Sequence, residues 1–168
     1  MALVPDYYYD SVFLIPYEDL FAKNIRGLIF DIDNTLTPFD QDLPPEEIVQ
    51  LLERLKSMGF KVCLLTNNTN GRLARFNKNI QMDGFANALK PRTKGVNQAM
   101  AKMETKPEST AIIGDQLLSD VWAGKRANIT TIMVKPITER DFFFVYVKRL
   151  IERIMLRKFF RNLKENGQ

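Results

Sequence analysis

A short run of apolar residues that ends in two aspartates constrains the fold of this chain more than any other feature. Residues 28–32 follow Gly27 and are apolar apart from Asp31, and Asp33 comes directly after them. A strand that is apolar throughout, rather than alternating, is typical of a parallel sheet covered on both faces. Open α/β sheets bind ligands at the carboxyl ends of their strands, where both carboxylates fall. The run therefore predicts an α/β fold with a polar site at the end of this strand.

The two aspartates also indicate the chemistry of that site. We expect an irregular loop to begin near Asp31 and to bring the carboxylates of Asp31 and Asp33 to one place. Two negative charges held close together are unfavourable unless a metal ion or a cationic side chain offsets them. The pair therefore favours a hard metal ion and phosphate chemistry.

The rest of the chain alternates apolar segments with amphipathic ones. Further strands are expected at 61–66, 85–89, 110–114 and 130–134. Helices are expected at 44–59, from about 70 to 80, and at 93–103 and 119–127. This alternation is typical of a doubly wound, mostly parallel sheet. Because one helix fills the longest gap between strands, we expect no cap domain over the site.

The size and charge of the chain predict one domain with an unusual end. At 168 residues it is large enough for its own core, and we expect a single domain at 1–168. Its parts would be a core at 25–135, an N-terminal arm at 1–24 and a C-terminal tail at 138–168. The tail has eight basic and four acidic residues, which account for the whole net charge of +4.

The residue inventory excludes several classes of enzyme. The chain has no histidine, so histidine phosphatases, His-ligated zinc hydrolases and Ser-His-Asp triads are excluded. A cysteine phosphatase is excluded as well, because Thr69 stands where the phosphate loop of Cys63 would need an arginine. Cys63 is expected to be a small core residue in a reducing compartment.

Three further segments place polar side chains at the same edge of the predicted sheet. Thr66 and Asn67 end one strand, Lys90 follows the short one, and Asp115 and Asp120 follow the strand at 110–114. Mg²⁺ prefers oxygen ligands, commonly a few carboxylates with waters and a substrate phosphate. Phosphoryl transfer mainly requires in-line positioning and neutralisation of charge. The set therefore suits Mg²⁺ and a phosphoryl group.

In order and position, these segments resemble the four motifs of the haloacid dehalogenase (HAD) superfamily of aspartate-nucleophile phosphatases. The resemblance covers about residues 25–135. The first motif is matched by residues 31–35, the second by Thr66, the third by Lys90, and the fourth by residues 114–115 with Asp120. Four motifs in order are far more specific than a lone pair of aspartates. The resemblance implies a Rossmann-like core without a cap.

The resemblance also implies roles for the aspartates. Asp31 would attack phosphorus and form an aspartyl-phosphate. Asp33 would protonate the leaving oxygen and then deprotonate the attacking water. Asp31, the backbone carbonyl of Asp33, and Asp115 would hold Mg²⁺.

The other motif residues would support this chemistry. Thr66 and Lys90 would hold the phosphoryl oxygens, and Asp120 would orient metal-bound water or Lys90. Each has a plainer alternative: a helix cap for Thr66, a solvated lysine for Lys90, and a favourable charge at a helix start for Asp120. Asn67 is expected to be a supporting turn residue rather than a reader of substrate.

The basic tail suggests a second surface. Residues 142–164 are predicted to form an amphipathic helix with two apolar stripes and a basic face. One stripe would pack on the body, and the other would meet an anionic membrane surface. The alternative is that the N-terminal arm covers both stripes. Nucleic acid is not expected as a partner, because bulky aliphatic residues interrupt the basic ones.

A narrower resemblance bears on the substrate. The short capless body, the opening Pro-Asp-Tyr-Tyr at 5–8 and the basic tail are similar to the YqeG-type phosphatases of subfamily IIIA. That family is similar to phosphatidylglycerophosphate phosphatases. The resemblance implies Mg²⁺-dependent hydrolysis of a phosphomonoester on a lipid headgroup. The alternative substrate is a soluble sugar, nucleotide or protein phosphate.

Two alternative functions of the chain are not enzymatic. A phospho-acceptor signalling domain would place an acidic pair first and its acceptor on a later strand, against the order here. A non-catalytic scaffold would use the arm and tail as binding surfaces.

No apolar stretch approaches the ~20 residues of a membrane span, and the start lacks a signal peptide's features. We expect a cytoplasmic protein, either free or peripheral on the inner face of the membrane.

Overall fold

The computed structural model describes residues 3–138, and the predicted tail helix at 142–164 lies outside that range. Residues up to Ile137 belong to one compact unit. Among the residues described, no helix has both the length and the apolar character needed to cross a membrane.

A six-stranded sheet forms the centre of this unit, and every pairing in it is parallel. Its order is β1-β6-β5-β2-β3-β4. The strands are β1 (Tyr7–Tyr9), β2 (Gly27–Phe30), β3 (Lys61–Leu65), β4 (Asp83–Phe85), β5 (Thr110–Gly114) and β6 (Thr130–Val134). The chain moves outward from β2 to β3 and β4, then returns to β5 on the other side of β2. Ligand sites in such sheets lie where the direction of winding changes, here between β2 and β5.

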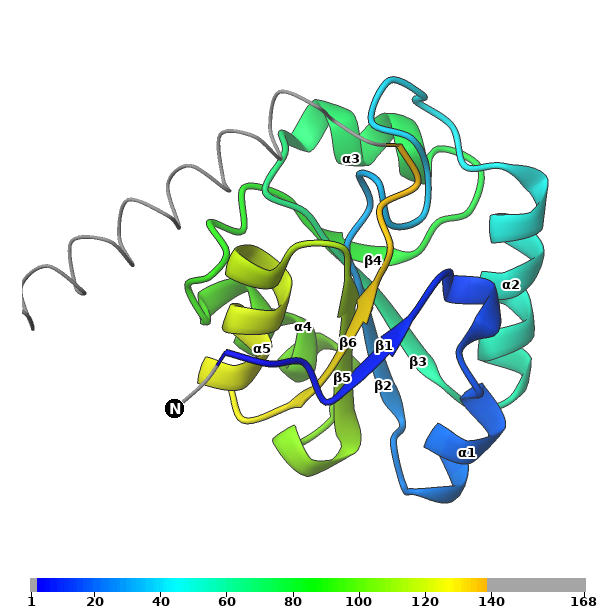
Figure 1. Ribbon diagram of the computed structural model, residues 1–168. Helices are drawn as coiled ribbons and strands as arrows, with labels where there is room; N and C mark the ends of the chain where they lie inside the picture. Colours follow the sequence, from blue (N-terminus) through cyan, green and yellow to red (C-terminus); the bar gives the residue numbers. More distant parts are fainter. Residues whose placement is uncertain (1–2, 139–168) are drawn as a thin grey trace, which may run out of the picture. The chain divides into compact units, whose positions relative to one another are not determined.

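Helices cover both faces of the sheet (Figure 1). They are α1 (Tyr17–Ala22), α2 (Glu46–Ser57), α3 (Asn70–Asn77), α4 (Lys94–Met103) and α5 (Trp122–Arg126). Shorter turns occur at Val12–Leu14, Pro107–Ser109 and Leu117–Val121. This arrangement confirms the predicted doubly wound α/β fold, and no cap domain occurs between residues 3 and 138.

The core divides along the two faces of the sheet. Leu28 and Phe30 of β2 pack in one cluster with Leu52 of α2, while Ile29 packs in the other with Val96 of α4. All four residues of β2 are buried. The strand is apolar throughout because both of its faces are covered.

The N-terminal arm is part of the sheet, which the sequence did not predict. β1 pairs with β6 at the edge of the sheet. Asp6 fixes the start of this strand, since its Oδ2 accepts from both the N–H and the hydroxyl of Thr131, each at 2.8 Å. Tyr17 is fully buried, and its hydroxyl donates to the carbonyl of Val12 at 2.8 Å. The arm therefore contributes core residues as well as an edge strand.

Two other elements differ from the sequence-based expectation. The edge strand expected at 85–89 lies earlier, at β4 (Asp83–Phe85), and Leu89 adopts a left-handed φ of 52°. The helix expected at 119–127 is a π-helical turn at Leu117–Val121 followed by α5. π-helical turns are frequent at functional sites, and this one carries Asp120.

Candidate active site

The chain leaves the sheet at Asp31 and turns sharply. The Asp31 N–H still donates to the Ile113 carbonyl of β5 at 2.9 Å. The next turn closes on Ile32, whose carbonyl accepts from the N–H groups of Thr35 and Leu36 at 3.2 and 3.0 Å. Asn34 adopts a left-handed φ of 63°, which asparagine tolerates better than most residues. Asp31 therefore stays at the end of the sheet, while Asp33 sits on the turn.

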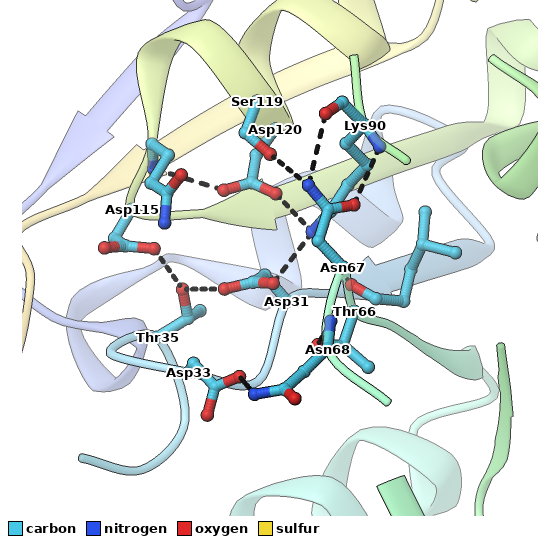
Figure 2. A network of polar contacts seen from close by, with 12 residues as sticks. Asp31, Asp33, Thr35, Thr66, Asn67, Asn68, Lys90, Asp115, Ser119 and Asp120 are labelled. Atoms are coloured by element: carbon cyan, nitrogen blue, oxygen red, sulfur yellow. Dashed lines mark hydrogen bonds and ion pairs between the residues drawn. The ribbon is translucent and has the colours of Figure 1, made fainter. Parts of the chain in front are cut away.

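Lys90 forms the centre of a buried ionic cluster (Figure 2). Its Nζ lies 2.7 Å from Asp31 Oδ1, 2.6 Å from Asp120 Oδ1 and 2.9 Å from the Leu65 carbonyl oxygen. These three acceptors use all three N–H groups of the ammonium. Burial by itself would lower the pKa of Lys90, but the charges of Asp120 and Asp31 outweigh it and raise that pKa. Lys90 is thus a charged, fully bonded ammonium inside the site.

Asp120 reaches Lys90 because of the π-helical turn and a glycine beside it. Its other oxygen, Oδ2, accepts from the Gln116 N–H at 3.1 Å. A Cβ at position 114 would lie 2.2 Å from the Asp120 carboxyl carbon, so only glycine leaves room for this carboxylate. Both Asp120 oxygens have protein donors, which suits a residue that holds Lys90 in place.

Asp31 and Asp115 face each other across a single hydroxyl. Thr35 Oγ1 lies 3.2 Å from Asp31 Oδ2 and 3.2 Å from Asp115 Oδ1, as Figure 2 shows. One hydroxyl has one proton and can donate to only one of these oxygens. Burial raises the pKa of both aspartates above the ordinary range, and the neighbouring carboxylates add to that effect. Without a cation, the site therefore holds protons on these carboxyls more readily than free aspartates do, and a bound cation would favour their ionised form.

The charges of the cluster fit a divalent cation. Oxygen atoms of Asp31, Asp115 and Asp120 lie within 4.8 Å of one another, and all three residues are buried. One ammonium, Lys90, offsets three carboxylates, so the ionised cluster has a net charge of about −2 before any metal binds. An all-oxygen, carboxylate-rich site of this charge is the kind that Mg²⁺ occupies. The residues present therefore fit the metal that the sequence predicts.

The segment after β3 connects these groups. Asn67 bonds the backbone of Lys90 twice: its Oδ1 accepts from the Lys90 N–H at 2.7 Å, and its Nδ2 donates to the carbonyl at 3.1 Å. Thr66 is buried, and its hydroxyl oxygen accepts from the Asn68 N–H at 3.0 Å. Asn67 thus holds the loop of Lys90, and Thr66 presents a hydroxyl at the end of β3.

Asp33 has a partner that the sequence did not predict, Arg72 of α3. Arg72 Nε donates to Asp33 Oδ1 at 3.1 Å, and Asn68 Nδ2 donates to Asp33 Oδ2 at 3.1 Å. Arg72 Nη1 also donates to the Asp42 carbonyl at 2.9 Å, and its side chain is only 4% exposed. Arg72 precedes Phe76 by one helical turn, so it lies on the buried face of α3, where a charge needs a partner. This spacing was the one feature of the sequence from which a buried, paired Arg72 could have been predicted, although it does not identify the partner.

Comparison with known proteins agrees with the predicted family and fold. A family model described as haloacid dehalogenase-like hydrolase matches residues 39–134. The Bacillus subtilis protein named "Probable phosphatase YqeG" is 35% identical over 153 residues, which cover 91% of this chain and 89% of that protein. The chain belongs to the haloacid dehalogenase-like hydrolase family, as the four motifs predicted. It is a phosphatase, similar over nearly its whole length to the Bacillus protein.

A more distant relative and two solved structures complete the comparison. Chlamydomonas reinhardtii "Phosphatidylglycerophosphate phosphatase 1, chloroplastic" is 26% identical over 82% of this chain, which spans about half (55%) of the algal protein. The fold resembles NagD of Escherichia coli K-12, with a TM-score of 0.56 and 16% identity over 70% of this chain and 91% of NagD. The fold also resembles cobalt-bound YrbI of Haemophilus influenzae, with a TM-score of 0.56 and 21% identity over 68% of this chain and 70% of YrbI. These two likenesses concern the fold alone.

Proposed function

We propose that this protein is a Mg²⁺-dependent phosphomonoesterase that uses Asp31 as its nucleophile and acts on the phosphate of a lipid headgroup. The observation that carries the first part is the ionic cluster, where one ammonium offsets three buried carboxylates. Asp31, Asp115 and the backbone carbonyl of Asp33 would hold Mg²⁺. The bound ion would draw charge from the phosphoryl oxygens and so favour attack on phosphorus.

The reaction has two steps at phosphorus. In the first, an Asp31 carboxylate oxygen forms a bond to phosphorus while the bond to the leaving oxygen breaks, and Asp33 gives that oxygen a proton. In the second, Asp33 takes a proton from water as the water oxygen attacks phosphorus, which releases Asp31 and inorganic phosphate. Thr66 would donate a hydrogen bond from its hydroxyl to a phosphoryl oxygen. Lys90 would give up its hydrogen bond to Asp31 and donate that N–H to a phosphoryl oxygen instead.

The substrate is the second part of the proposal. The similarity to the algal phosphatidylglycerophosphate phosphatase supports a lipid headgroup, and phosphatidylglycerophosphate is the specific proposal. The lack of a cap between residues 3 and 138 supports it too, because a phosphate at a membrane surface needs an open site. The second candidate is a soluble phosphate ester, which the same ionic cluster would also accommodate.

The organisation of the whole chain belongs to the same proposal. We propose that residues 1–168 act as one phosphatase domain and that the tail at 142–164 contacts an anionic membrane surface. The protein would then work in the cytoplasm, on the inner face of the membrane.

The test compares lipid and soluble substrates directly. Phosphate release from phosphatidylglycerophosphate in mixed micelles is measured with Mg²⁺ and with chelator, beside soluble sugar, nucleotide and peptide phosphates. We expect metal-dependent turnover with kcat/KM highest for the lipid. Faster turnover of a soluble ester would keep the mechanism and reject the lipid substrate. No metal-dependent release from any of these would reject the proposal as a whole.

Removing the metal is expected to make stability depend on pH. The pKa values of Asp31 and Asp115 are raised in the folded protein, so this state binds more protons than the unfolded chain, whose aspartates titrate near 3.9. The free energy of unfolding should therefore fall as the pH rises from about 4 through the raised values. Mg²⁺ should remove much of this loss, since it binds the ionised form.

Thermal unfolding in chelator and in Mg²⁺ is compared at about pH 5, below the raised pKa values of about 7 for Asp31 and about 8 for Asp115, and at about pH 9, above both. The stabilisation by Mg²⁺ should be larger at the higher pH, and Asp115→Asn should reduce the difference. Equal stabilisation at both pH values would contradict the metal site.

Replacing Arg72 is expected to reduce kcat by misplacing Asp33. Arg72→Met removes the ion pair at 3.1 Å and should lower kcat by roughly 10- to 100-fold, the cost of a small misplacement of a reacting group. Arg75→Met is the matched control, since Arg75 lies on the same helix and pairs with Asp42 in the open, at 54% and 59% exposure. Exposed pairs contribute little. Equal kcat values for the two variants would show that Arg72 does not position Asp33.

A further inference from the structure

Arg72 uses only part of its guanidinium to hold Asp33. Its Nε donates to Asp33 Oδ1 at 3.1 Å, while its Nη2 is buried and has no partner among residues 3–138. Nε and Nη2 share the edge of the guanidinium that commonly binds both oxygens of a carboxylate at once. Leaving a buried donor without a partner is unfavourable, so this one, beside a proposed reacting group, calls for a physical explanation.

The explanation is Asn68, which holds the other oxygen of Asp33. Asn68 Nδ2 donates to Asp33 Oδ2 at 3.1 Å, as Figure 2 shows. While Oδ2 is bound there, it makes no bond to Nη2 of Arg72. The carboxylate therefore lies between two donors, and the second bond that Arg72 could make to it is missing.

Asn68 is itself held in place by its neighbours. Its Oδ1 accepts from the Thr69 N–H at 2.8 Å, so Nδ2 is the end of the amide that faces Asp33. Its backbone carbonyl accepts from the Asn87 N–H, also at 2.8 Å. Because these groups are already bonded, Asn68 loses little further conformational freedom when Nδ2 binds the carboxylate.

The two oxygens of Asp33 face different surroundings. Oδ2 is bound by Asn68, whose N–H also donates at 3.0 Å to the hydroxyl oxygen of Thr66, the group proposed to contact the phosphoryl oxygens. Oδ1 is bound by Arg72, whose side chain is 4% exposed and which also donates to the Asp42 carbonyl. Asp33 therefore presents Oδ2 on the side of Thr66 and Oδ1 toward the interior.

We propose that Asn68 is a positioning residue that keeps Oδ2 of Asp33 away from Arg72 and available to the leaving oxygen of the substrate. Without Asn68, the carboxylate would turn until Arg72 binds both of its oxygens, through Nε and Nη2. Two such bonds are stronger than the single bond seen here, and they would hold Oδ2 in the interior. This role rests on the proposed function, because it assumes that Asp33 gives a proton to the leaving oxygen and later takes one from water.

A matched pair of variants tests this role by kinetics. Asn68→Ala removes the donor to Asp33 but keeps the backbone N–H that binds Thr66. Asn70→Ala is the control, since Asn70 is exposed at the first position of α3. With glycerol phosphate as substrate, Asn68→Ala should lower kcat by about 100-fold, the cost of a small misplacement of a reacting group. Asn70→Ala should match the wild type, and equal kcat values for the two variants would overturn the proposal.

The two half-reactions separate a misplaced Asp33 from general damage to the site. p-Nitrophenolate is a good leaving group that needs little help from an acid, whereas attack of water on the aspartyl-phosphate still needs Asp33 as its base. Asn68→Ala should therefore release p-nitrophenol from p-nitrophenyl phosphate in a burst close to the enzyme concentration, and then turn over slowly. Slow release without a burst would mean that the first step is damaged too, and would overturn the proposal.

A double variant tests whether Arg72 captures the carboxylate when Asn68 is absent. Arg72→Met removes the donors that would bind Oδ2 of Asp33 in the interior. The combination of Asn68→Ala with Arg72→Met should therefore be several-fold faster than Asn68→Ala alone. If the two residues supported Asp33 independently, the combination would instead be slower than either single variant, and that result would overturn the proposal.

A measurement that needs no turnover separates this inference from the proposed function. The crystal structure of Asn68→Ala should show both oxygens of Asp33 bound by Arg72, one through Nε and the other through Nη2. A carboxylate that keeps its present place in that structure would overturn the proposal, whether or not the protein hydrolyses any ester. Failure of the proposed function would appear elsewhere, as a lack of metal-dependent turnover by the wild type.

Discussion

Replacing Asp31 with asparagine is expected to reduce Mg²⁺-dependent phosphate release by at least about 10⁴-fold, because it removes the proposed nucleophile. The amide has nearly the same shape, but its oxygen is a poor nucleophile and its nitrogen would face Lys90 or Thr35. The measurement is the single-turnover rate with a soluble ester. Asp40→Asn is the control, since Asp40 is exposed on the loop after β2 and should retain full activity.

The Asp31→Asn variant should still fold, so a loss of activity can be assigned to the missing nucleophile. Asparagine removes one of three carboxylates that lie within 4.8 Å of one another, so it lowers repulsion in the metal-free protein. The unfolding temperature without metal should therefore not fall, while the stabilisation by Mg²⁺ should decrease. Substantial remaining activity in a folded Asp31→Asn protein would contradict the assignment of the nucleophile.

Replacing Lys90 with methionine is expected to have the largest effect on stability. Lys90 is 1% exposed and offsets Asp31 and Asp120 at 2.7 and 2.6 Å. Removing one partner of a buried ion pair leaves an uncompensated charge, at a cost of about 3–5 kcal/mol. Denaturant unfolding of the metal-free protein at neutral pH measures the loss. Activity should fall as well, because the phosphoryl group loses its cationic contact.

Lys102→Met is the matched control for that experiment. Lys102 pairs with Asp83 at 3.5 Å, and both side chains are more than half exposed. A pair of this kind contributes at most about 1 kcal/mol. If Lys90→Met were as stable as Lys102→Met, the carboxylates around Lys90 would have to be neutral in the folded protein. The electrostatic argument for a divalent cation would then fail.

Much of the fold could be predicted because its strands are buried on both faces. β5 and β6 occupy the predicted residues, since a short apolar run between helices has few other structures available. β1 could not be predicted in this way. It has three residues, its burial alternates weakly, and it is held by Asp6 and Thr131. That contact joins positions 125 residues apart and leaves no local pattern.

The site could be predicted as a set of residues but not as a set of contacts. The fold places Asp31, Thr66, Lys90 and Asp115 at one edge because parallel strands end together. The pairing of Asp33 with Arg72 joins residues 39 apart, and a single arginine on a helix gives no signal about its partner. The position of Asp120 depends on a π-helical turn and on Gly114, which periodicity does not predict. Their roles in the reaction remain predictions until activity is measured.

Trapping the covalent intermediate tests the central claim most directly. The protein is mixed with p-nitrophenyl phosphate and Mg²⁺, quenched during turnover and treated with borohydride, which reduces an aspartyl-phosphate to homoserine. We predict that mass spectrometry finds homoserine at position 31, only with Mg²⁺ and substrate present. Homoserine at another aspartate, or none in a preparation that turns over the ester, would contradict Asp31 as the nucleophile.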